Sequence, residues 1–408
     1  MVRNISIDAL KRRGWLLALM LLSGCAGPVA SPLLEEFEAD GVAEAIEVEP
    51  VDTPVPTPEG KTETPLLPGA SSTPTAEPTP SRVGLDSTEA TNPLTGLAVE
   101  NGDALRCRPI LISVANFPPS ARPQAGLSFA AQVWETFIGY GMTRFLAVYY
   151  GDHLARLAEA AKNPMTERTD DSGFVIGPIR SGRVVYADIK GLFPGAQLIA
   201  ASASAEVAEQ LSNMTSVFGT DPEDVNSAGM DLDQLAKHCG PLVDPAEYST
   251  LTFDPVAPAG GQQAESFQVI YNLYNQIGWD YDRAQGAYLR SQDTADGTGD
   301  LVPLADRLTG EQLAFENIAV LWAPHRYETR TIIRINLLYM RNLTGLLFRD
   351  GIVYEVRVST RSGKLQFTDE AGNTLPLKPG RTFFEVVSYE TTWTPEKGIV
   401  RYHNPPAP

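Results

Sequence analysis

Cysteine and histidine are scarce in this chain, and their spacing does not fit the common metal sites. The 408 residues contain 3 cysteines and 4 histidines, with no CxxC and no HExxH motif. The histidines stand far apart, at His153, His238, His325 and His403. Zinc sites draw their ligands from cysteines and histidines at short spacing. The sequence therefore predicts no metal site, and we expect no cofactor.

Long apolar runs are also lacking. The run at 15–22 has about eight residues, whereas a transmembrane helix needs roughly 20. It follows a basic segment and ends in Leu22-Ser23-Gly24-Cys25, a sequence typical of a lipobox. We therefore predict a lipoprotein signal peptide at 1–25 and a lipid on Cys25 that anchors the protein outside the cytoplasmic membrane. An ordinary signal peptide with an incidental cysteine is the alternative.

Positive charge is in deficit. The net charge is −18, and residues 1–25 contain four basic residues and one acid, which leaves −21 for the rest of the chain. Such a balance argues against nucleic acid as a partner and against a surface that binds anionic lipid. The expected contact with a membrane is the lipid on Cys25, and a protein partner cannot be named.

Residues 26–90 have few aromatic residues and many prolines, threonines and glutamates. Such a composition cannot bury enough apolar surface to offset the entropy of the chain. We predict a disordered linker over this segment. Proline and like charges extend a linker of this kind, so it serves as a spacer.

The remaining chain has the pattern of a folded protein. Apolar, β-branched runs at 108–114, 132–138 and 143–150 predict strands, and 181–192 has helical spacing. A proline- and glycine-rich break at 254–263 precedes a series of short strand candidates. We therefore predict two domains, a mixed α/β domain at 91–255 and a mainly β domain at 264–402. Cys107 and Cys239 are expected to be two buried thiols, although the compartment also permits a disulfide.

Several segments resemble the YerB-like bacterial lipoproteins. They are NPLTGL at 92–97, RPILISVANFPPSARPQAGLS at 108–128, VWETF at 133–137, GMTRFLAVY at 141–149, GPIRSGR at 177–183 and FTDEAGNTLPLKPGRTFFEVV at 367–387. The resemblance implies a lipid-anchored extracytoplasmic protein with a separate C-terminal domain. It implies no reaction, because the family is a domain of unknown function. The chain departs from the family at 115–117, where it reads Ala-Asn-Phe in place of Asp-Asn-His.

The candidate site consists of polar residues within these segments, and its arginines and glutamate match the family pattern. They are Arg122, Glu135, Arg144, Arg180, Ser181 and Arg183. Arginine presents a planar fork of donors that suits carboxylate or phosphate. In GPIRSGR, a turn at Gly177-Pro178 is expected to place Arg180 and Ser181 at the start of a helix, which favours an anion.

Three functions are compatible with these residues. The first is binding of an anionic small molecule or cell-envelope fragment in an arginine-lined cleft formed by Arg122, Arg144 and Arg180. The second is a structural or interaction lipoprotein in which Arg144 pairs with Glu135 and the arginines only build the fold. The third is a cell-envelope hydrolase that uses Glu135. The chain lacks the serine–histidine and metal motifs of common hydrolases, so the sequence favours a protein that is not an enzyme.

Overall fold

The computed structural model describes residues 90–162, 174–329 and 332–405. The signal peptide predicted at 1–25, the lipidation site at Cys25 and the linker predicted at 26–90 lie outside the described residues, except for Ala90. Within the described ranges, no helix is long and apolar enough to cross a membrane.

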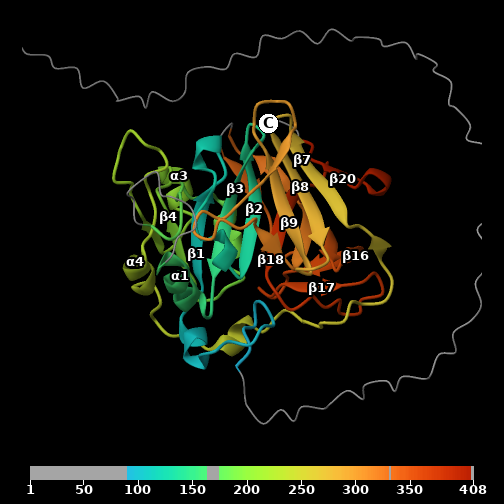
Figure 1. The fold of residues 1–408 in the computed structure, drawn as a ribbon, viewed down its shortest axis with the longest axis horizontal. Coiled ribbons are helices and arrows are strands. Elements are labelled where there is room, and N and C mark those ends of the chain that lie inside the picture. The colour runs from blue at the N-terminus through green and yellow to red at the C-terminus, as the bar shows by residue number, and fades with distance from the viewer. Residues whose placement is uncertain (1–89, 163–173, 330–331, 406–408) are drawn as a thin grey trace, which may run out of the picture. The chain divides into compact units, whose positions relative to one another are not determined.

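The fold is built on a large mixed sheet of 11 strands (Figure 1). The strand order is β17-β16-β15-β12-β18-β2-β3-β1-β4-β5, and β6 also pairs with β16. The strands are β1 (Ile110–Ala115), β2 (Gln132–Gly139), β3 (Met142–Tyr149), β4 (Gln197–Ala200), β5 (Met214–Ser216), β6 (Gln262–Gln263), β12 (Asn317–Ala323), β15 (Leu343–Arg349), β16 (Ile352–Ser359), β17 (Gln366–Thr368) and β18 (Thr382–Ser388). The strands predicted at 108–114, 132–138 and 143–150 are confirmed as β1, β2 and β3.

The two segments predicted as separate domains, 91–255 and 264–402, share this sheet. Strand β2 pairs in parallel with β18 over Gln132–Thr136 and Thr382–Val386. Both strands are buried along their whole length, so each needs a hydrogen-bonded neighbour on both edges. The described residues accordingly fall into one compact unit rather than two.

A second sheet of 7 strands packs against one face of the large sheet. Its strands are β7 (Ser266–Asn272), β8 (Asn275–Asp282), β9 (Ala287–Asp293), β10 (Leu301–Pro303), β11 (Ala314–Phe315), β19 (Thr392–Thr394) and β20 (Ile399–Arg401), and a separate two-stranded ribbon is formed by β13 (His325–Tyr327) and β14 (Ile333–Ile335). Aromatic rings fill the space between the sheets. Phe267 stacks on Phe348 with centroids 3.7 Å apart, and Trp279 meets Phe383 edge-on at 4.9 Å. These contacts form the core that joins the two sheets.

The helices are short, and in Figure 1 α1, α3 and α4 lie beside β1 and β4. They are α1 (His153–Lys162), α2 (Val185–Lys190), α3 (Ala205–Ala208) and α4 (Leu232–Ala236), with 3₁₀ turns η1 (Gly102–Arg106), η2 (Pro119–Ala121), η3 (Leu127–Phe129), η4 (Pro245–Tyr248) and η5 (Pro395–Lys397). The fold is therefore mainly β. The predicted mixed α/β domain is correct only for the β1–β4–β5 edge, where parallel strands alternate with helices. Elsewhere β2 and β3 form an antiparallel hairpin, which needs no helical crossover.

A disulfide joins Cys107, which follows η1, to Cys239, which follows α4. The expectation of two separate thiols is therefore wrong. Sequence spacing could not reveal the pair, because 132 positions separate the two residues. The bond ties the start of β1 to the segment that follows the β4–β5 edge.

We expect the double variant Cys107→Ala/Cys239→Ala to lose about 2–5 kcal/mol of unfolding free energy. The cross-link restricts the unfolded chain, and long loops gain most from this effect. Urea denaturation measures the loss. Wild-type protein treated with dithiothreitol provides the control and should unfold at the midpoint of the double variant. Equal midpoints for oxidised wild type and the double variant would show that the bond contributes nothing.

Candidate functional site

The GPIRSGR segment runs as extended backbone between the ends of β1 and β4. The Arg180 amide donates to the Ser113 carbonyl at 2.9 Å, and the Ala201 amide donates to the Arg180 carbonyl at 2.9 Å. Helix α2 begins only at Val185. The prediction that Arg180 and Ser181 open a helix is therefore wrong, because their backbone groups bridge two strands. Arg180 and Ser181 therefore present no helix N-terminus to an anion.

Three arginines gather where this segment meets β3. Arg144 projects from β3 and is 6% exposed, and one of its Nη1 hydrogens reaches the Ser181 carbonyl at 3.0 Å. Burial first, and then the positive charges of Arg183 and Arg180, lower the pKa of Arg144 to about 9. The group remains charged at neutral pH. We call Arg144, Arg180 and Arg183 the arginine cluster.

The arginine cluster has little to balance its charge. Within the described ranges, none of the three guanidinium groups forms an ion pair, and the Nε atom of each is buried without a hydrogen-bond partner. Among the described residues, the Arg183 guanidinium donates only to the neighbouring Gly182 carbonyl. A carboxylate at Asp224 raises the pKa of Arg180, but burial has the larger effect and lowers it. A cation that is shielded from water without a counter-ion costs free energy, so an anion that binds here would be stabilised.

Neutral polar groups surround the cluster. The Ser113 hydroxyl donates to the Ser181 carbonyl at 3.2 Å and lies 3.3 Å from the Tyr186 hydroxyl. Sequence reasoning did not single out Ser113 or Tyr186. No local motif marks them as functional, because Ser113 lies within the apolar strand β1 and Tyr186 within helix α2. Ser181 itself is partly exposed, and the bonds near it use its carbonyl rather than its hydroxyl.

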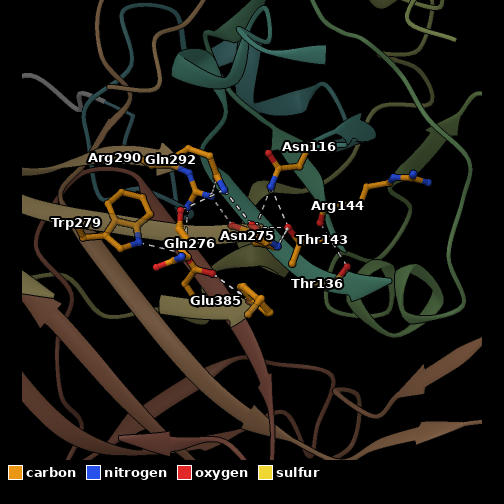
Figure 2. A network of polar contacts seen from close by, with 12 residues as sticks. Asn116, Thr136, Thr143, Arg144, Asn275, Gln276, Trp279, Arg290, Gln292 and Glu385 are labelled. Carbon is orange, nitrogen blue, oxygen red and sulfur yellow. Dashed lines mark hydrogen bonds and ion pairs between the residues drawn. The ribbon is translucent and has the colours of Figure 1, made fainter. Parts of the chain in front are cut away.

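Glu135 lies on the opposite face of the large sheet from Arg144. In the β2–β3 hairpin Glu135 is opposite Phe145, whereas Arg144 is opposite Thr136. Side chains alternate between faces along a strand, so Arg144 cannot meet Glu135. Figure 2 shows the Arg144 side chain pointing away from the polar network in which Glu135 takes part. The predicted Arg144–Glu135 pair is therefore wrong.

The network around Glu135 joins the two sheets. Glu135 and Glu385 are register partners on β2 and β18, and Arg290 on β9 reaches both of them. Its Nη2 group lies 2.8 Å from a Glu135 oxygen and its Nη1 group 3.1 Å from a Glu385 oxygen. The Trp279 indole N–H and the Tyr271 hydroxyl also donate to Glu385, at 3.1 and 3.2 Å. Figure 2 shows Arg290, Trp279 and Glu385 in this network.

This network is closed to substrates. The side chains of Glu135, Arg290 and Glu385 are all 0% exposed. Burial and the nearby charge of Glu135 raise the pKa of Glu385 to about 8, despite the opposing charge of Arg290. The Glu385 carboxyl therefore favours its protonated, uncharged form at neutral pH. The buried contacts of Arg290 with Glu135 and Glu385 join the two sheets. A substrate cannot reach Glu135 for hydrolysis, because its side chain is fully buried.

Arg122 lies at the edge of the network around Glu135 and is linked to it through Asn116. Its Nε group donates to the carbonyl and side-chain oxygens of Asn116, each at 3.1 Å, and its Nη1 group donates to the Asp293 carbonyl at 2.8 Å. The Asn116 amide in turn donates to Glu135. The single cleft expected from Arg122, Arg144 and Arg180 is therefore divided. Arg122 and Glu135 lie with the network, and the other candidate residues lie with the cluster.

Two family models match successive parts of the chain. The model described as "Protein of unknown function (DUF3048) N-terminal domain" matches residues 94–229, and its C-terminal counterpart matches 267–384. The chain belongs to the DUF3048 family. The N-terminal match of this family includes the whole arginine cluster, and the C-terminal match includes Arg290.

A curated DUF3048-like relative comes from Bacillus subtilis (strain 168) and is named "Putative lipoprotein YerB". It is 27% identical over 313 residues, which cover 72% of this chain and 85% of the relative. The crystal structure of the YerB protein from Bacillus subtilis matches with a TM-score of 0.56 at 25% identity. That match covers 73% of this chain and 96% of the solved chain. The YerB-like resemblance of the sequence is thus confirmed, and the shared fold extends over both DUF3048 parts.

Proposed function

We propose that this protein is a membrane-anchored extracytoplasmic lipoprotein that binds an anionic small molecule or cell-envelope fragment through Arg144, Arg180 and Arg183. The observation that carries the proposal is the lack of an ion pair, within the part of the chain that the structure describes, at three clustered arginines whose Nε atoms are buried without a hydrogen-bond partner. An incoming carboxylate or phosphate would supply that charge and accept hydrogen bonds from the unused guanidinium donors. Ser181, beside them, would add a hydroxyl.

The proposed lipid anchor is supported by the sequence and by the name of the relative from Bacillus subtilis. The lipobox-like Leu22-Ser23-Gly24-Cys25 lies outside the described residues, and the Bacillus subtilis relative bears the name of a lipoprotein. A lipid on Cys25 would hold the folded part outside the membrane, at the end of the proline-rich spacer. Such a location would expose the arginine cluster to anionic components of the envelope.

The alternative is an architectural role for the same arginines. The bond from Arg144 to the Ser181 carbonyl favours it, since that bond joins β3 to the GPIRSGR segment. For Arg180 the described residues provide no side-chain hydrogen bond, and its exposure is intermediate. Arg180 is therefore the residue that separates ligand binding from architecture.

We expect the wild-type protein to bind orthophosphate, citrate or a muropeptide saturably at low ionic strength. Native mass spectrometry would show the complex, and a thermal-shift titration would show stabilisation. Arg180→Gln should weaken binding roughly tenfold or more, because a hydrogen bond to a charged group contributes about 1.5–3 kcal/mol. Its melting temperature without ligand should stay close to that of the wild type.

The matched control is Arg361→Gln, which removes an exposed arginine far along the chain from the cluster. It should leave anion binding unchanged. If none of the anions binds, and Arg180→Gln and Arg144→Gln both melt early, the arginines are architectural and the proposal fails.

A further inference from the structure

A second positively charged feature lies at the other end of α2. A cavity of about 530 Å³ opens there, lined by Arg108, Lys190, Phe193, Gln197, Leu211 and Asn213 among others. Its walls come from the start of β1, the end of α2, the start of β4 and the segment before β5. Small-molecule sites commonly have volumes of roughly 300–1,000 Å³, so the cavity is large enough for a ligand.

The charge of this cavity is of one sign. Its lining contains Arg108 and Lys190 and no aspartate or glutamate. Within the described ranges, neither cation forms an ion pair. Arg108 uses its Nε group on the His238 carbonyl at 2.9 Å, and Lys190 donates to the Ser212 carbonyl at 2.7 Å. Burial, and then the charge of Arg108, lower the pKa of Lys190. In a chain with a net charge of −18, two neighbouring cations without an acid in the cavity lining are unusual.

The disulfide holds one of these cations in place. Arg108 directly follows Cys107, and its amide donates to the Cys239 carbonyl at 3.1 Å. The carbonyl that accepts from its Nε group belongs to His238, beside the second cysteine. The remaining guanidinium donors make no other hydrogen bond within the described part of the chain, so they are free to contact a ligand. Because the Arg108 side chain is already held in place, it loses little conformational entropy when its unused donors bind a ligand.

We infer that this cavity binds a small organic anion, a carboxylate or phosphate ester with an apolar body. The anionic group lies between Arg108 and Lys190, and the apolar body lies against Phe193 and Leu211. Gln197 and Asn213 line the same space, and the Gln197 side chain is held by bonds to the Asn213 carbonyl and the Thr215 hydroxyl. This site is separate from the arginine cluster and does not depend on it.

Isothermal titration calorimetry on the whole protein at low ionic strength tests the inference, with phenyl phosphate and benzoate as probes. Benzyl alcohol lacks the charge and orthophosphate lacks the apolar body, so both should bind more weakly. Lys190→Gln and Arg108→Gln should each raise the Kd for phenyl phosphate about tenfold, which corresponds to one lost charge-assisted contact.

Two controls define the site. Lys397→Gln removes an exposed lysine elsewhere and should leave this Kd unchanged. Arg180→Gln removes a member of the arginine cluster, so titrating the cavity variants in the Arg180→Gln background separates the cavity from any anion bound at the cluster. Lys190→Gln remains informative even if Arg108→Gln disturbs the disulfide segment. Absence of saturable binding at millimolar probe, or binding that survives both cavity substitutions in folded protein, would overturn the inference. Loss of binding in Arg180→Gln alone would assign the probe to the cluster instead.

Discussion

Replacing Arg290 with methionine is expected to destabilise the protein by about 3–5 kcal/mol, the usual cost of removing one partner from a buried ion pair. Arg290 is fully buried and contacts carboxylates from β2 and β18 together with the ring faces of Trp279 and Phe383. Methionine would fill part of the volume but leave Glu135 and Glu385 without a cation. The loss is a large share of the roughly 5–15 kcal/mol that stabilises a typical domain.

Urea denaturation at neutral pH measures this effect. The triple variant Arg290→Met/Glu135→Gln/Glu385→Gln removes the cation and both carboxyl groups, and we expect it to recover much of the lost stability. Arg357→Met is the control, since this arginine lies on β16 with its side chain 39% exposed; its cost should stay below about 1 kcal/mol. A loss at Arg290 no larger than at Arg357 would contradict the view that this residue joins the sheets.

Replacing Glu385 with glutamine is expected to remove a pH dependence of a few kcal/mol from the stability. Glutamate ordinarily titrates near 4.5, and in the folded protein burial and Glu135 raise the pKa of Glu385 to about 8. Between these values the folded protein keeps a proton that the unfolded chain releases. The contribution of Glu385 is therefore fully present below about pH 4.5 and is lost as the pH rises through 8. Glutamine stays neutral throughout, and its amide can still bond to Trp279 and Tyr271.

The quantity to measure is the difference in unfolding free energy between wild type and Glu385→Gln from pH 4.5 to 9. A difference is needed because burial also lowers the pKa of His153 and of His325 to about 4. Those histidines reduce stability as the pH falls from 6.5, which opposes the trend from Glu385. The unfolding free energy of Glu385→Gln should increase relative to that of the wild type as the pH rises, and it should be the larger of the two above pH 8. Glu355→Gln, at an exposed position of β16, should show no such trend. Parallel curves for wild type and Glu385→Gln would contradict the raised pKa.

The strands of the sheet were predictable from local pattern, but their partners were not. The apolar runs that became β1, β2 and β3 are long and bounded by turns, so their type and bounds follow from the sequence. The pairing of β2 with β18 joins Gln132 to Thr382. No local propensity specifies a contact of that separation, and the same limit hid the disulfide. The sequence consequently suggested two domains where one sheet continues through both.

The candidate site was only partly predictable, for a related reason. Residue type and family pattern singled out Arg144, Arg180 and Arg183, which the structure brings together. The same criteria also selected Arg122 and Glu135, which lie on the other face. The hairpin turn at Gly139-Tyr140-Gly141 offered a signal, since its register places Phe145 rather than Arg144 opposite Glu135. Arg290 and Glu385 carry no motif, and only the packing of the two sheets reveals their roles.

Crystals of the protein grown with selenate would test directly whether the arginine cluster binds an anion. Selenate resembles phosphate in shape and charge, and its anomalous scattering locates the anion without prior assumption. We expect an anomalous peak within hydrogen-bond distance of the Arg144 and Arg180 guanidinium groups, and we expect it to be absent from crystals of Arg180→Gln. If wild-type crystals show no peak there, with this surface free of lattice contacts, the arginine cluster is part of the architecture and the proposed function is wrong.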